Sequence, residues 1–196
     1  MSRYNFYFKK VIDVFLEFPI IVSPSALGAI LLIFFQTPIG TFIQNNLIEF
    51  VFMFSGIVLA QFITIIGMAI RLIKISFDEV PIRYENVART LGANQIQVFL
   101  TITLPLAKKG IISSIILVWA KAIGEFGATI TLAGSIPIKT ETLPIAIFMK
   151  LSIADIKGTV TLIIILLTIS ISILIITRIF FKSKNNALRL SYRKEI

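Results

Sequence analysis

A lysine and a glutamate, Lys121 and Glu125, stand four residues apart inside an otherwise apolar stretch of the chain. Residues at this spacing share one face of a helix, and charges within an apolar helix usually face protein or water. Two interpretations follow. Either the pair lines a pathway, in which Lys121 supplies positive potential for an anion and Glu125 holds it in place, or the two charges simply neutralise each other. The second interpretation is favoured over direct contact with an anion.

The sequence contains no cysteine and no histidine. Disulfides, thiolate zinc sites and cysteine nucleophiles are therefore excluded, and so is a Ser-His-Asp triad. Residues 134–140 superficially resemble a phosphate-binding loop, but Ile138 stands where a glycine is required before the lysine. We expect no catalytic residue, no metal site and no cofactor bound by this chain.

The elements that must position these side chains are membrane helices. Hydrophobic residues make up 57% of the 196 residues and charged residues only 15%, whereas soluble domains carry about 25% charged residues. Crossing a bilayer takes about 20 apolar residues, and a shorter stretch, Leu143–Ile153, is expected to form an interfacial or re-entrant helix. The expected fold is all-α, a polytopic membrane bundle in one domain over residues 1–181 with a polar basic tail over 182–196. The expected spans cover residues 14–35, 47–70, 111–133 and 159–181.

The placement of Lys and Arg predicts the topology. Fifteen of the nineteen basic residues fall on one side of the membrane if both termini are cytoplasmic, and three fall on the other. Cytoplasmic loops are enriched in Lys and Arg, so this orientation is favoured. It also accounts for most of the net charge of +9, which therefore gives no reason to expect nucleic acid as a partner. We expect a multi-pass protein of the cell inner membrane.

The longest cytoplasmic connection, residues 72–110, is predicted to form two short helices. The first starts near Pro81 and carries an apolar stripe that includes Val87 and Ala88. Gly92 is expected to cap it in the left-handed conformation, Asn94 to cap the second helix, and Pro105 to stop that helix before the next span. Such a helix pair either fills a groove on a soluble partner or lies on the lipid surface, held by basic residues.

This stretch resembles a family motif. The sequence Asn86-Val-Ala88-x3-Gly92-x9-Ile102-x-Leu104-Pro105 is similar to the Glu-Ala-Ala-x3-Gly-x9-Ile-x-Leu-Pro loop of ABC-transporter permease subunits. Asn86 stands where that family has Glu, and Glu85 lies one residue early. The resemblance implies that an ABC ATPase docks on this loop. The ATPase-coupling residues that it implies are Glu85, Asn86, Ala88, Gly92, Ala93, Ile102, Leu104 and Pro105.

Other segments resemble the molybdate, tungstate and sulfate importers within this family. They are Phe18–Pro24, which contains two prolines expected to kink the first span, and Gly124-Glu-Phe-Gly-Ala-Thr129. Small residues recur every four positions at Ala120, Gly124 and Ala128, which indicates either a homodimer seam or packing within the chain. The candidate pathway and gate residues are Pro19, Pro24, Lys121, Gly124, Glu125, Gly127 and Thr129.

The resemblance implies a non-catalytic permease subunit that translocates a tetrahedral oxyanion, molybdate first, with ATP hydrolysed by a separate subunit. Its implied partners are the ABC ATPase, an extracytoplasmic oxyanion-binding protein, membrane lipid and a second copy of the chain. Such permeases usually carry one more N-terminal span, which would be absent by truncation, by natural shortening or because another polypeptide supplies it. The alternatives are a permease for tungstate or sulfate, or a stand-alone secondary anion carrier or channel.

Overall fold

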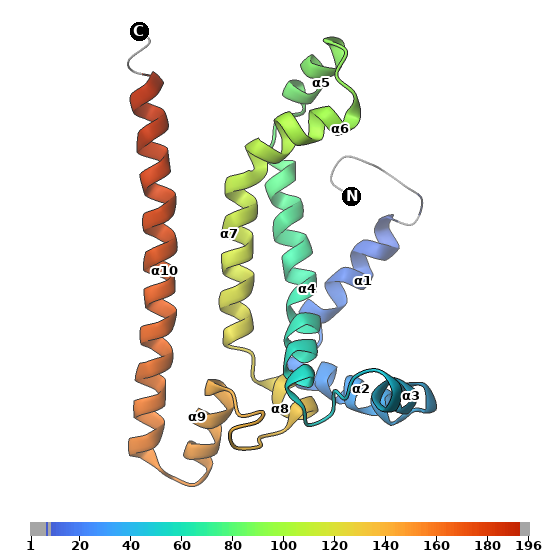
Figure 1. The fold of residues 1–196 in the computed structure, drawn as a ribbon, viewed down its shortest axis with the longest axis vertical. Coiled ribbons are helices and arrows are strands. Elements are labelled where there is room, and N and C mark those ends of the chain that lie inside the picture. The colour runs from blue at the N-terminus through green and yellow to red at the C-terminus, as the bar shows by residue number, and fades with distance from the viewer. Residues whose placement is uncertain (1–6, 8, 193–196) are drawn as a thin grey trace. The chain divides into compact units, whose positions relative to one another are not determined.

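The computed structural model describes Tyr7 and residues 9–192, and these residues form helices joined by short connections (Figure 1). The chain divides into two compact units, residues 1–141 and 142–196. The predicted all-α class is confirmed, because the described residues contain no strand. The first unit contains α1 (Lys9–Ile21), α2 (Pro24–Gln36), α3 (Pro38–Asn46), α4 (Phe54–Asp78), α5 (Ile82–Thr90), α6 (Gln95–Val98), the π-helical turn η1 (Phe99–Thr103), α7 (Leu104–Ile123) and α8 (Gly127–Ala133), and the second contains α9 (Leu143–Ser152) and α10 (Ile156–Tyr192).

Three helical stretches among the described residues are long and apolar enough to cross a membrane: Phe54–Asp78, Gln95–Ile123 and Ile156–Ile175. Their bounds differ from the expected spans. The second expected span was placed seven residues early, because Phe52 takes a positive φ of 56° and α4 begins only after Met53. The helix at the fourth expected span, α10, continues to Tyr192, so its backbone includes most of the expected tail.

The first expected span is not one helix. α1 and α2 meet at an angle of 107°, a far sharper bend than the expected kink. Ser23 is extended (φ −60°, ψ 139°) and its side chain accepts a hydrogen bond from the Ala26 N–H, while Pro24 occupies the first turn of α2. The residue before a proline is disfavoured in the helical region, which explains why the break falls there. Pro19 lies inside α1, and the helix continues past it.

The third expected span is also interrupted, and here the prediction of one helix over 111–133 is wrong. α7 ends at Ile123, and α8 begins only at Gly127. Hydropathy does not reveal this break, since the residues on both sides of it are apolar. Pro105 does not stop a helix either. Residues 95–123 run on as one helical stretch. The π-helical turn η1 ends at Thr103, two residues before the proline, where the α-helical hydrogen-bond pattern cannot continue unchanged.

The two long helices of the first unit, α4 and α7, run side by side (Figure 1). They approach closely where Gly110 of α7 meets Ser76 of α4: a Cβ placed on Gly110 would lie 2.7 Å from the Ser76 Cβ. Just beside this point the buried hydroxyls of Ser76 and Ser114 share a hydrogen bond of 3.2 Å. Small residues and interhelical hydroxyl bonds are typical of close helix packing in membranes.

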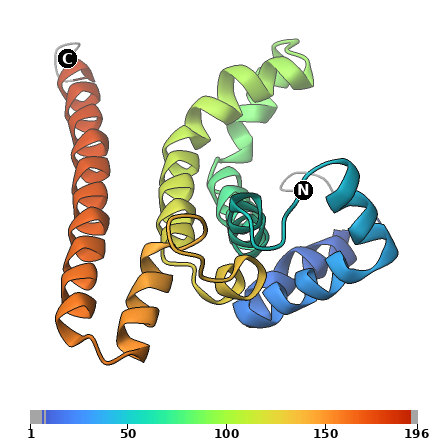
Figure 2. The same cartoon turned by 60° about the horizontal axis from the view of Figure 1, so that its bottom comes forward.

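The core of the first unit lies where α2, α4 and α8 meet. Phe35, Ala60, Ala128 and Leu132 form its buried cluster, and the ring of Phe35 stacks on Phe50 at a centroid distance of 5.0 Å. Figure 2 shows α8 lying beside α2. The helices can come this close because Gly28 has no side chain: a Cβ there would stand 2.7 Å from the Ala128 carbonyl oxygen.

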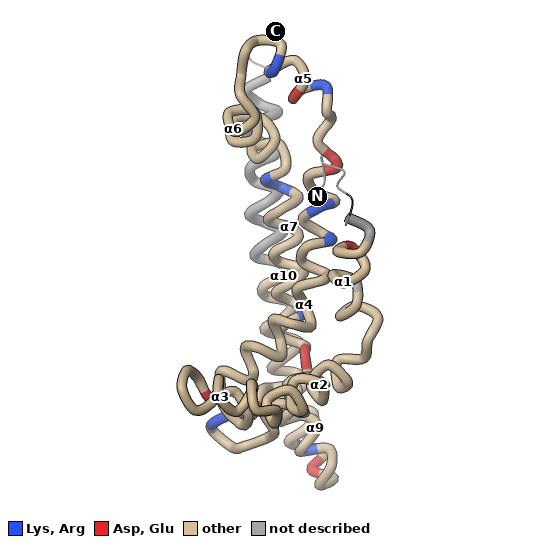
Figure 3. The backbone as a smooth tube through the Cα atoms, turned by 90° about the vertical axis from the view of Figure 1, so that its right-hand side faces the viewer, with Lys and Arg blue, Asp and Glu red and all other residues tan. Residues whose placement is uncertain are grey.

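Beyond the paired ends of α4 and α7, the chain folds back on itself as α5, a tight turn and α6, which we call the helical hairpin (residues 82–98; Figure 1). Lys and Arg positions gather toward this end of the two long helices, whereas their middle portions carry few charges (Figure 3). That this end faces the cytoplasm stays a prediction from the basic residues.

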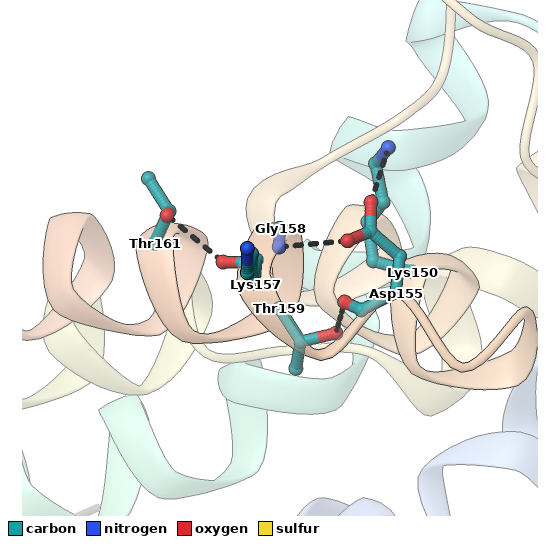
Figure 4. Close-up of polar contacts among 6 residues, drawn as sticks. All are labelled: Lys150, Asp155, Lys157, Gly158, Thr159 and Thr161. Carbon is teal, nitrogen blue, oxygen red and sulfur yellow. Dashed lines mark hydrogen bonds and ion pairs between the residues drawn. The ribbon is translucent and has the colours of Figure 1, made fainter.

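In the second unit, Asp155 lies in the turn between α9 and α10 and fixes the start of α10 (Figure 4). Its carboxylate accepts a hydrogen bond of 2.9 Å from the Gly158 N–H and one of 3.0 Å from Lys150 Nζ. These two interactions, of which the bond from Gly158 has the larger effect, hold the pKa of the Asp155 carboxyl below its usual value of 3.8.

The expected interfacial or re-entrant helix over 143–153 corresponds to α9, which has ten residues.

We expect Asp155 to make the stability of this turn pH-dependent. The pKa of the Asp155 carboxyl is lower in the folded chain than the 3.8 of the unfolded chain, so the ionised carboxylate stabilises the fold above pH 3.8. This stabilisation is lost as the pH falls below 3.8 and through the lower pKa of the folded state. Thermal unfolding measured between about pH 5 and pH 2 should therefore show a smaller pH dependence in Asp155→Asn than in the wild type. Substituting the exposed Glu141 by Gln is the control, and an equal effect of both substitutions would contradict the assignment.

Candidate functional site

The turn of the helical hairpin is built by two local motifs. Gly92 has a φ of +87°, the Ala93 N–H bonds the Ala88 carbonyl at 3.1 Å, and the Gly92 N–H bonds the Arg89 carbonyl at 3.0 Å. This pair of bonds is the Schellman arrangement. It confirms the prediction of a left-handed glycine at the end of the first helix.

The second motif starts α6. The side chain of Asn94 accepts a hydrogen bond of 2.8 Å from the Gln97 N–H, and the side chain of Gln97 accepts one of 2.9 Å from the Asn94 N–H. This reciprocal pair is a capping box, so the predicted cap at Asn94 is confirmed. Together the two motifs fix both the exit from α5 and the entry into α6.

The hairpin turns most of its apolar side chains outward. Most of the apolar stripe predicted on α5 faces outward: Val87 and Leu91 are 59% and 83% exposed, and only Ala88 is buried. The inner side instead holds Glu85, which is 3% exposed, together with Val98 and Thr103. The large hydrophobic side chains left exposed on the hairpin and at its junction with η1 are Ile82, Tyr84, Val87, Leu91, Ile96, Phe99 and Leu100.

The other residues of the family-like pattern occupy three kinds of position. Asn86 is exposed on α5, and Ala93 is half-buried within the turn. Ile102 and Leu104 are half-buried at the base of the hairpin, where η1 passes into α7. Pro105 is exposed in the first turn of α7. The structure therefore brings the pattern together as one folded unit rather than as an extended loop.

A second candidate site lies at the break between α7 and α8. Lys121 Nζ stands 3.8 Å from a carboxylate oxygen of Glu125, as the four-residue spacing predicts, but Glu125 lies beyond the end of α7 rather than on its face. Its side chain is 2% exposed, and its other oxygen accepts a hydrogen bond of 3.1 Å from the Ala128 N–H. Glu125 therefore caps the start of α8, while Lys121 is about half exposed.

The remaining pathway candidates are divided between this break and other elements. Gly124 is exposed in the break, so Ala120, Gly124 and Ala128 do not form the continuous stripe that one helix would have given. Gly127 packs against the start of α2, where an added Cβ would lie 2.6 Å from the Ser25 Oγ and 3.3 Å from Pro24. Thr129 is fully buried, and its hydroxyl has no hydrogen-bond partner. Pro19 lies apart from these residues on α1, which packs on α4.

We expect Glu125→Leu to destabilise the fold and Glu125→Gln to have a smaller effect. Leucine leaves the buried Ala128 N–H without its acceptor and Lys121 without its counter-charge, whereas the glutamine oxygen can still accept the bond. An unsatisfied buried donor costs about 1–3 kcal/mol. The unfolding midpoint of each variant is measured on the purified protein in detergent. A Glu125→Leu midpoint equal to that of the wild type would show that the cap contributes nothing.

These features define a membrane-embedded helical protein whose two long helices carry a folded helical hairpin at one end. The chain belongs to the family described as "Binding-protein-dependent transport system inner membrane component", whose model matches residues 1–185. The resemblance drawn from the sequence is confirmed at this level. Among the described residues, no group of three or more Asp and Glu side chains could hold a metal ion.

Three relatives show where the chain lies within this family. It is 34% identical over 172 residues to the "Probable transport system permease protein NifC" of Clostridium pasteurianum, which covers 87% of this chain and 60% of the relative. It is 37% identical over 153 residues to the "Molybdenum transport system permease protein ModB" of Escherichia coli, covering 76% and 66%. It is 30% identical over 157 residues to the "Sulfate transport system permease protein CysT" of Salmonella typhimurium, covering 79% and 57%. The chain thus spans less than two thirds of the length of these relatives.

Proposed function

We propose that this chain is the permease subunit of an ABC importer and that the helical hairpin receives a separate ATPase subunit. The observation that carries the proposal is the outward apolar face of the hairpin, led by Leu91 and Ile96, which are 83% and 71% exposed. The backbone of the turn is fixed by its caps, so this face is presented in one conformation. Apolar anchors on a rigid helical element are the usual means of docking into a groove on a partner.

A surface that lies on lipid would show a different distribution of charge. The charged residues of the hairpin are Arg83, Glu85 and Arg89, which give it a net charge of +1, and Arg89 pairs with Glu85. Asn86, Gln95 and Gln97 add polar groups without net charge. A hairpin held on anionic lipid would instead be rich in Lys and Arg along its polar side, with more than this one surplus positive charge. The helical hairpin therefore fits a protein groove better than a lipid surface.

The proposed substrate is a tetrahedral oxyanion, molybdate before tungstate or sulfate. This assignment is supported by relatives named as molybdenum and sulfate permeases.

In the proposed mechanism, two copies of the chain enclose a central pathway, and a binding protein delivers the oxyanion from the extracytoplasmic side. ATP is hydrolysed on the partner ATPases, whose closure moves the hairpins and switches the pathway between outward-facing and inward-facing states. Both termini lie in the cytoplasm.

The proposal is tested by reconstituting the chain in proteoliposomes with an ABC ATPase and an oxyanion-binding protein from the same organism. We expect ATP hydrolysis to rise on addition of molybdate with loaded binding protein, and tungstate and sulfate are compared side by side. Uptake that proceeds without any ATPase would instead identify a secondary carrier. A complex that hydrolyses ATP but responds to none of the three oxyanions would refute the substrate assignment alone.

A further inference from the structure

Glu85 is a carboxylate buried within an otherwise exposed hairpin. Its side chain is 3% exposed, whereas its neighbours Tyr84 and Asn86 are exposed. Burying a carboxylate is costly unless hydrogen bonds and an opposite charge compensate for the lost water. The buried carboxylate of Glu85 is therefore stabilised by the groups around it, and its role can be inferred from those groups.

The first of these groups lies on a different element. Thr103 Oγ1 donates a hydrogen bond of 3.2 Å to Glu85 Oε1, and the two residues are eighteen positions apart in the chain. Thr103 is itself buried, with 6% exposure, at the end of η1. On the outer side of α5, Arg89 Nη2 stands 3.9 Å from the other carboxylate oxygen. The carboxylate thus connects the first helix of the hairpin to the base of α7.

The geometry of η1 presents Thr103 on the inner side of the hairpin. The Leu104 N–H bonds the Phe99 carbonyl five residues back, which is the π-helical pattern. The hydroxyl of Thr101, in the same turn, is exposed and bonds only within its own helical stretch, to the Gln97 carbonyl at 2.6 Å. The two threonines therefore differ in role although they lie two residues apart.

Apolar side chains shield the bond between Glu85 and Thr103 from water. Ala88 and Val98, at 9% and 2% exposure, fill the inside of the hairpin. The ring of Phe99 lies 5.9 Å from that of Phe77 near the end of α4, so the same base also contacts the other long helix. Hydrogen bonds in such surroundings are stronger than those exposed to water.

We infer that Glu85 and Thr103 are positioning residues that lock α5 to the base of α7, so that the helical hairpin and α7 move as one rigid body. This role differs from docking, because neither side chain lies on the outward face of the hairpin. The consequence for transport rests on the proposed function: a rigid connection lets displacement of the hairpin reach the membrane helix, whereas a loose one lets the hairpin move alone. The lock itself is a property of this chain and needs no partner.

The lock is tested first on the full chain alone, by hydrogen exchange in lipid nanodiscs. Thr103→Val removes the hydroxyl and keeps the shape, Thr103→Ser keeps the hydroxyl, and Thr101→Val is the matched control. We expect the amides of α5 (Ile82–Thr90) to exchange about tenfold faster in Thr103→Val, since a bond to a charged group is lost, and at near wild-type rates in the other two variants. Equal exchange in Thr103→Val and Thr101→Val would overturn the inference.

The second test uses the complex with the ATPase and reads the ratio of substrate-stimulated to unstimulated ATP hydrolysis. We expect Thr103→Val to retain the bound ATPase but to lose most of the stimulation, and Thr103→Ser to restore it. A purely structural role would lower complex yield without changing the ratio. If the wild-type chain binds no ATPase, the proposed function fails while the exchange experiment still decides the lock. In the hydrogen-exchange experiment, Glu85→Gln provides a second variant. Because it keeps an acceptor oxygen, its α5 amides should exchange more slowly than those of Thr103→Val.

Discussion

Gly92→Val is expected to abolish co-purification of the ATPase and substrate uptake while leaving membrane insertion intact. The φ of +87° at Gly92 is a conformation that costs an L-residue about 1–2 kcal/mol, and a β-branched side chain is among the least tolerant of it. A Cβ at this position would have no atom within 4 Å, so the expected damage comes from the backbone conformation alone and not from a collision.

Gly92→Asn is the matched control for this prediction. Asparagine adopts the left-handed conformation more readily than other non-glycine residues, and the open space around the position accepts its side chain. It should therefore retain most ATPase binding. The measurement is the amount of ATPase recovered with the tagged permease, together with uptake in cells. Normal uptake by the valine variant would remove the case for a rigid coupling hairpin.

Gly28→Val is expected to give the largest loss of stability among the glycine substitutions of the α2–α8 contact. An added Cβ would lie 2.7 Å from the Ala128 carbonyl oxygen and 2.8 Å from the Thr131 Cβ, and the backbone carbonyl cannot move without displacing α8. Overpacking costs about 1–3 kcal/mol or more, which for a chain of this size lowers the unfolding midpoint by roughly 2–4 °C for each kcal/mol. Thermal unfolding in detergent gives the midpoint directly.

Gly124→Ala provides the comparison for Gly28, because Gly124 was also a candidate for close packing. The atoms nearest to a Cβ added at Gly124 would be backbone oxygens at 3.8 and 4.0 Å, which is ordinary van der Waals contact. The φ of −83° at Gly124 suits any residue. The alanine variant should therefore unfold within a few degrees of the wild type. If Gly28→Val also unfolded within a few degrees of the wild type, the α2–α8 contact would be looser than the distances indicate.

Local sequence chemistry was enough to predict the helical hairpin. Pro81, Gly92 and Asn94 each act through the backbone of their own turn, so their effect does not depend on what packs around them. The side that packs inward could not be predicted in the same way. Periodicity predicted an apolar stripe on α5 that includes Val87 and Leu91, and both are exposed. It could not predict that Glu85 is buried, because a partner of Glu85 lies eighteen residues away.

The breaks in the membrane helices were the part of the fold that hydropathy could not locate. Residues 111–133 are apolar on both sides of Gly124 and Phe126, so a window average reads them as one span. The break is instead stabilised by tertiary contacts. The buried Glu125 caps α8, and Gly127 packs closely against the start of α2. A carboxylate with small residues beside it inside an apolar stretch is the one signal that could have indicated a helix end.

The single wide turn at Phe99–Thr103 has a consequence for how length changes would act here. The π-helical turn holds one residue more than an α-helical turn for nearly the same rotation, so it can lose one residue without turning the hairpin. Successive residues of an α-helix are rotated by about 100°, so deleting a residue from the regular part of α7 would swing everything before it around the axis of α7. The contact face centred on Leu91 would then point in another direction although every one of its side chains was unchanged. The number of α-helical residues between the hairpin and the membrane-embedded part of α7 therefore sets the direction from which a docking subunit must approach.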